Sequence, residues 1–143
     1  MTDRAFQAKN VQSREQLNQL LAQRTEAELQ REVSHGWTIA ATLVHLAFWD
    51  LRALTLIEQF EKAGVSASAM DIEIANQIVQ RMAQAIPPAA ARQLWLETAT
   101  ALDQRIEALP DSLIDAIHAA GNPFNLPRHD HRAEHIAEIE KVL

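Results

Sequence analysis

The stretch from Trp37 to Asp50 is an apolar, helix-length run that contains a single histidine, His45. Apolar residues stand on every side of this run, so the helix it predicts has no polar face and must lie in a core. A buried imidazole is costly unless it finds a partner. His45 is therefore either a core histidine hydrogen-bonded to a carbonyl or threonine hydroxyl, or a metal ligand.

The end of the chain contains two further histidines that could bind a metal ion together with His45. His131 and His135 lie four residues apart, so they project from the same face of a helix. This spacing alone is a weak pattern, because it also occurs on solvated faces. The same stripe continues through Ile139 and Val142, which indicates that it faces the core. We therefore expect three imidazoles to converge on one metal ion.

The other polar residues near these two segments have simpler interpretations. Asp130 is predicted to cap the last helix rather than to join the metal shell. His129 beside it fits either a second ligand set or the start of that helix. His35 and His118 have no histidine neighbours, and we interpret both as surface residues.

Large aromatic side chains are more often core anchors than cofactor partners, and we read Trp37, Trp49 and Trp95 in this way. Trp49 follows His45 by four residues and could form the wall of a pocket. Asp50 is one step further around the helix, so a cap or a salt bridge is the preferred interpretation. Asn76 interrupts an apolar face and is a weak signal of a contact with another helix or a pocket.

Helical periodicity recurs along the chain, and no segment shows the alternation of a sheet strand. The pattern predicts an all-α fold: a four-helix bundle with a short accessory helix, in a single domain over residues 1–143. Asp71 is expected to cap the short helix, in which Ile74, Ile78, Val79 and Met82 share a face. Residues 111–128 are mixed, with one helical turn. The predicted long helices span about Ser13–Arg31, Thr38–Lys62, the Ala-rich run to Leu109, and His131–Leu143.

Composition narrows the classes of function. The chain has 143 residues, 48% of them hydrophobic, which suffices for one core. A net charge of -6 without a basic stripe argues against a nucleic-acid partner. With no cysteine, a metal must use nitrogen or oxygen ligands. No signal peptide is evident and no uninterrupted apolar run reaches the roughly 18 residues of a membrane span, so we expect a cytoplasmic protein without membrane contact.

Three segments together resemble the DinB/YfiT superfamily, and the resemblance spans nearly the whole chain. They are the run from Trp37 to Asp50, the segment Asp71-Ile72-Glu73-Ile74-Ala75-Asn76, and the terminal His131-Arg132-Ala133-Glu134-His135-Ile136. The resemblance implies a four-helix bundle in which one histidine of the second helix and two of the last hold a divalent metal. These are His45, His131 and His135 here. Homodimers are also common among such proteins.

Members of this superfamily include transferases and isomerases that use bacillithiol, mycothiol or glutathione. We therefore expect a metal-dependent enzyme that transfers a small thiol to an electrophilic small molecule, with an open position on the metal. A hydrolase, or a non-catalytic binding or stress-associated protein, is the alternative. Zinc or nickel is the favoured cation, with manganese or iron also open. The expected partners are a small-molecule substrate, a low-molecular-weight thiol and a second copy of the chain.

Overall fold

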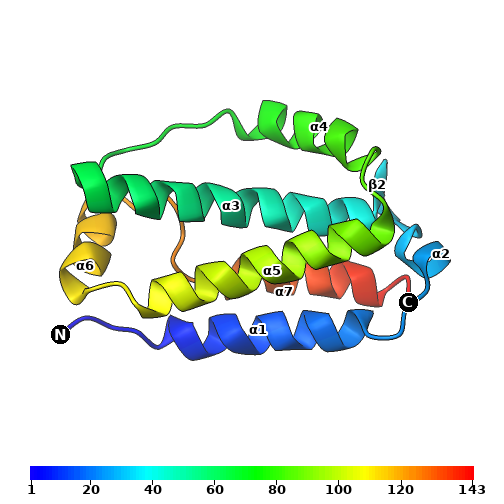
Figure 1. Cartoon of the computed structure of the whole chain (residues 1–143), viewed down its shortest axis with the longest axis horizontal. Helices are drawn as coiled ribbons and strands as arrows, with labels where there is room; N and C mark the ends of the chain where they lie inside the picture. The colour runs from blue at the N-terminus through cyan, green and yellow to red at the C-terminus, as the bar shows by residue number, and fades with distance from the viewer.

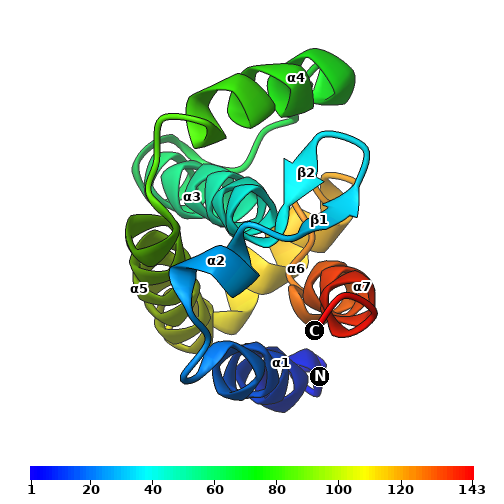
Figure 2. The same ribbon diagram turned by 90° about the vertical axis from the view of Figure 1, so that its right-hand side faces the viewer.

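Four helices run side by side and form a bundle in the computed structural model, which describes all residues 1–143 (Figure 1). Viewed end-on they occupy four corners, and a further helix, α4, lies outside them against α3 (Figure 2). This arrangement confirms the predicted all-α four-helix bundle with an accessory helix. The bundle helices are α1 (Phe6–Leu21), α3 (Ile39–Ala63), α5 (Pro88–Glu107) and α7 (His129–Glu140).

The central helix α3 begins and ends close to the predicted residues. The Thr38 side chain caps its start by accepting a hydrogen bond from the Ala41 backbone N–H, and Gly64, at φ 85°, ends it. By length and composition α3 is the one helix that could cross a membrane, although charged residues interrupt its apolar run, and 61% of its most apolar stretch is buried inside the protein. Its apolarity is therefore that of a core helix.

Helix α4 (Ile72–Ala83) starts at the predicted cap, because Asp71 accepts a hydrogen bond from the Ile74 backbone N–H. The four residues predicted to share a face differ in burial: Ile74, Ile78 and Met82 are about half exposed, and only Val79 is buried. Because α4 packs against the bundle mainly through α3, a narrow stripe of mostly small side chains suffices for packing. That stripe consists of Ala75, Val79 and Ala83.

The predicted first helix, Ser13–Arg31, is in fact two helices. The chain leaves the helical conformation after Leu21, and Gln23 adopts φ 62°. Thr25 and Glu28 then form a capping box that begins the short helix α2 (Glu26–Leu29). Ser13, the predicted start of that helix, lies inside α1.

A two-stranded antiparallel sheet joins α2 to α3, where no strand was predicted. Its strands are β1 (Glu32–Ser34) and β2 (Trp37–Thr38). Gly36 turns the chain between them at φ 77°, and its carbonyl accepts a hydrogen bond from the Gln80 side chain of α4. A Cβ atom at Gly36 would lie only 2.6 Å from that side-chain nitrogen. Strands this short carry too little alternation to be recognised.

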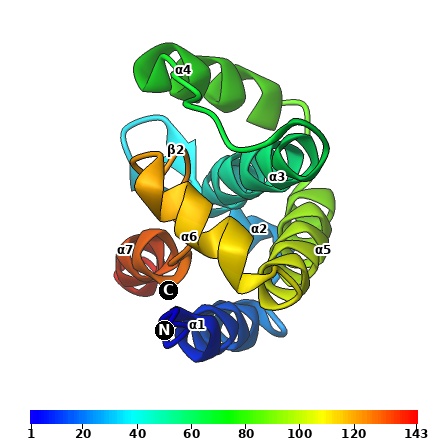
Figure 3. The same ribbon diagram turned by 90° about the vertical axis from the view of Figure 1, so that its left-hand side faces the viewer.

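Helix α6 (Asp111–Ala119) crosses one end of the bundle and extends the single turn that was predicted there (Figure 3). The chain then returns to the bundle and enters α7 at His129. Asp130 does not cap this helix as predicted, because its side chain is 81% exposed and contacts only His129. Instead, the Asn10 side chain of α1 accepts the hydrogen bond from the His129 backbone N–H, at 3.0 Å.

Candidate metal centre

The structure brings the three predicted histidines together. His45 lies on α3, and His131 and His135 lie on successive turns of α7. The Nε2 atom of His131 lies 3.0 Å from that of His45 and 3.2 Å from that of His135. The three ring centroids are 4.8–4.9 Å apart and each pair of rings is inclined by 71–74°. Three ring nitrogens therefore face one common point.

Hydrogen bonds among the three rings cannot give every Nε2 atom a suitable partner at the same time. A neutral imidazole carries one N–H, so each Nε2 atom is either a donor or an acceptor. The Nε2 atom of His131 faces two others, and as a donor it could serve only one of them. One cation could accept all three Nε2 lone pairs, with the protons on the Nδ1 atoms.

The spacing of the nitrogens also fits such a cation. Metal–nitrogen bonds of about 2.0–2.1 Å at ordinary tetrahedral or octahedral angles place the ligand nitrogens about 3.0–3.4 Å apart. The two short separations here fall within this range. The cluster is therefore compatible with binding a metal ion.

Burial keeps two of the three rings neutral. Desolvation lowers the pKa of His45 to about 4, assisted by the charge that His135 would carry and opposed by the nearby Asn76 side chain. Desolvation, again assisted by His135 and then by His45, lowers the pKa of His131 to about 3. Because a metal ligand must be an unprotonated imidazole, these two side chains need no deprotonation at neutral pH.

We expect the metal-free protein to lose stability as the pH falls below about 6.5. In this pH range both imidazoles bind a proton in the unfolded chain. In the folded chain they stay neutral until the pH reaches about 4 for His45 and about 3 for His131. Each group then contributes a slope of up to about 1.4 kcal/mol per pH unit. Urea unfolding between pH 7.5 and 4.5 measures this slope. If the free energy of unfolding of the double variant His45→Gln/His131→Gln depends on pH as steeply as that of the wild-type protein, these two histidines are not the source of the slope.

Neighbouring side chains hold the rings in place. Trp37 packs edge-on against the His45 ring, with centroids 5.5 Å apart. The Nδ1 atom of His135 lies 3.5 Å from a Glu138 carboxylate oxygen one turn further along α7. This contact is not a hydrogen bond, and the buried Nδ1 atoms of His45 and His135 both have no hydrogen-bond partner.

Two clefts reach the cluster from different sides. The larger, about 770 Å³, is lined by His45 and His131, and the smaller, about 240 Å³, by His45 and His135. Asn76 of α4 lines both and accepts a hydrogen bond from Trp49 Nε1 at 3.0 Å. Asn76 and Trp49 thus contribute to the pocket walls. The larger cleft is of the size at which proteins bind small molecules.

A buried ionic network fixes α7, and sequence reasoning did not single it out. Arg132, only 1% exposed, donates two hydrogen bonds of 2.9 Å to Asp103 of α5 and one of 3.4 Å to Asp50 of α3. Arg128 also pairs with Asp50, at 2.9 Å. Arg14 of α1 completes the network on Asp103. Because Arg132 adjoins His131 in sequence, the network that anchors α7 also positions its two histidines.

The remaining predicted residues lie outside the cluster. His35 and His118 are exposed, as expected, and His118 bonds with Asn122. His129 begins α7 and contacts Asp130, which fits its interpretation as a helix-start residue. Trp95 is fully buried, whereas the other two tryptophans are partly exposed beside the clefts. The salt-bridge interpretation of Asp50 is confirmed.

Comparison with known proteins gives one family. Residues 10–139 match the family described as the DinB superfamily. This range contains all of the bundle helices, apart from the first turn of α1 and the last residue of α7, and all three histidines. No curated protein and no solved structure matches the chain.

Proposed function

This chain belongs to the DinB superfamily, and from this premise we propose that His45, His131 and His135 bind one divalent cation at a catalytic centre. The observation that carries the proposal is the convergence of three Nε2 atoms whose side chains line two adjoining clefts. Zinc and nickel are the preferred cations, because both accept imidazole readily, and manganese and iron are further options. Three protein ligands are fewer than these ions take, so the set is that of a catalytic rather than a closed structural site.

We further propose that the reaction joins a small thiol to an electrophilic small molecule. When bound, the cation would supply the positive charge that favours the thiolate over the thiol. In an addition, a sulfur–carbon bond forms, the carbon–carbon double bond is lost, and the thiol proton moves to the neighbouring carbon. In a displacement, a carbon–leaving group bond breaks and the proton departs with that group. The larger cleft offers room for both reactants beside His45 and His131.

Metal binding should stabilise the protein against heat. The ligands come from α3 and α7, so a cation held by all three cross-links two helices and binds only the folded chain. At a free metal concentration of about 100 times Kd, the stabilisation is about 2.7 kcal/mol. Thermal melts of chelator-treated protein with added zinc or nickel measure this shift, and chelation should reverse it. An unchanged melting temperature at saturating metal would refute the site.

Activity separates the proposal from its alternatives. Elemental analysis of protein purified without a histidine tag identifies the cation, and a panel of thiols and electrophiles then tests transfer. Turnover with a thiol supports the proposed reaction, whereas hydrolysis of esters or amides without a thiol supports a hydrolase. Confirmed metal without turnover in either panel would favour a non-catalytic binding protein. Assembly as a homodimer stays a prediction.

A further inference from the structure

The larger cleft extends from the histidine cluster along α3. His45, Trp49 and Arg52 line it, and their spacing of four and three residues places them on one face of the helix. An α-helix rises about 1.5 Å per residue, so Arg52 lies roughly 10 Å along the axis from His45. Only 4 of the 17 lining residues are hydrophobic, which favours a polar ligand.

Arg52 carries a charge that the protein does not neutralise. Its Nη1 and Nη2 atoms donate to the backbone carbonyls of Pro123, at 3.1 Å, and Ser68, at 2.8 Å. Its guanidinium carbon lies 5.9 Å from the centroid of the Trp49 ring. It forms no ion pair, whereas Arg128 on the same cleft pairs with Asp50. Two carbonyl contacts leave three of the five guanidinium N–H groups free.

Burial and the neighbouring Arg128 both disfavour the charge on Arg52. Burial lowers the pKa of Arg52, and the nearby charge of Arg128 lowers it further. Both effects mean that the cation lacks compensation in the folded protein, which an anion would supply. The guanidinium is also held in place by its carbonyl and indole contacts, so little freedom would be lost on binding an anion.

We propose that Arg52 is a subsite for a carboxylate group on one of the two reactants. A planar carboxylate can accept two parallel N–H bonds from a guanidinium. A singly charged group suits the cleft better than a phosphate dianion, because Asp130 and Glu134 also line it and offset its two arginines. The role of this subsite in the reaction rests on the proposed function, whereas the binding itself does not.

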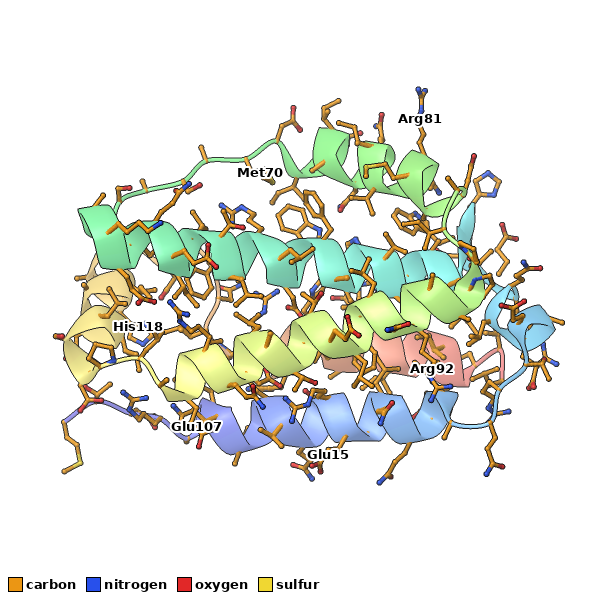
Figure 4. The ribbon with its side chains drawn as sticks, in the orientation of Figure 1. Glu15, Met70, Arg81, Arg92, Glu107 and His118 are labelled. Atoms are coloured by element: carbon orange, nitrogen blue, oxygen red, sulfur yellow. The ribbon has the colours of Figure 1, made fainter.

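Binding can be tested without metal or catalysis. We would titrate the full chain, with its metal chelated, with glutarate and with the neutral diamide glutaramide, and follow tryptophan fluorescence. Glutarate should bind at least about tenfold more tightly, since hydrogen bonds to a charged group exceed neutral ones. Arg52→Gln should remove this preference. Arg81→Gln, which removes an exposed arginine pointing away from the bundle, should retain it (Figure 4).

Two results would overturn the subsite. One is equal affinity of the wild-type protein for glutarate and glutaramide, a comparison that needs no variant and so holds even if Arg52→Gln disturbs its loops. The other is a folded Arg52→Gln protein that still prefers glutarate. This result would show that Arg52 serves only to join the segments at Ser68 and Pro123.

The reactant that carries the carboxylate can then be identified with metal-loaded protein. One arm compares N-acetylcysteine with its amide, and the other compares maleate with its dimethyl ester. A higher kcat/KM for the acid in either arm, if it is lost in Arg52→Gln, supports the subsite and shows which reactant carries the carboxylate. Turnover without any acid preference overturns its role in the reaction. Glutarate binding without turnover in any combination supports the subsite and counts against the proposed reaction.

Discussion

Replacement of His135 by alanine is expected to abolish metal-dependent turnover and to leave the bundle folded. The imidazole provides one of the three nitrogens that face the proposed cation, so its loss leaves two ligands and an incomplete shell. The apolar stripes that hold the helices together do not include this side chain. Elemental analysis and isothermal titration report metal content and affinity, and circular dichroism reports folding.

His35→Ala is the matched control, because it removes an exposed imidazole from the turn between β1 and β2. This variant should bind metal and turn over like the wild-type protein. A His135→Ala protein that retains metal with wild-type affinity would exclude His135 from the site, even if its activity were lost.

Replacement of Arg132 by methionine is expected to lower the free energy of unfolding by about 3–5 kcal/mol. The variant keeps most of the side-chain volume but leaves the carboxylates of Asp50 and Asp103 without their shared partner in the core. Asp50 keeps its pair with Arg128 and Asp103 keeps its pair with Arg14, but the hydrogen bonds that Arg132 donates to both carboxylates are lost in the core, where an unmet polar group is costly. Such a loss is a large share of the stability of a small domain. Urea unfolding at pH 7.5 measures it.

Two further variants make this result specific. Arg105→Met breaks the exposed pair with Glu61, and we expect it to cost no more than about 1 kcal/mol. Adding Asp103→Leu to Arg132→Met should recover part of the loss, because the carboxylate that loses two buried hydrogen bonds from Arg132 is then gone. Equal costs for Arg132→Met and Arg105→Met would show that the buried network contributes little.

The sequence predicted those parts of the structure that depend on local periodicity. The long apolar run around His45 and the four-residue spacing of His131 and His135 each fix a helix face, and two such faces sufficed to predict the histidine cluster. The cap at Asp71 was equally visible, because it acts within its own helix turn.

Contacts between distant residues could not be predicted in this way. Arg132 pairs with carboxylates 29 and 82 residues away, and the cap of α7 comes from Asn10, 119 residues before it. Nothing in a single sequence indicates such pairings. The exposure of Ile74, Ile78 and Met82 was missed for a related reason, since periodicity shows that a face is apolar but not whether another element covers it.

The position of the Arg132 network has a consequence for the supply of metal. The network and the two apolar clusters on either side of it hold α3 and α7 in register without help from a cation. A cation at the proposed site would therefore enter and leave through the adjoining clefts with no rearrangement of helices. We expect rapid exchange at that site, with occupancy set by the free concentration of each metal in the surroundings. Which ion would occupy the proposed site is then decided after folding, and the occupant can change during the lifetime of the protein.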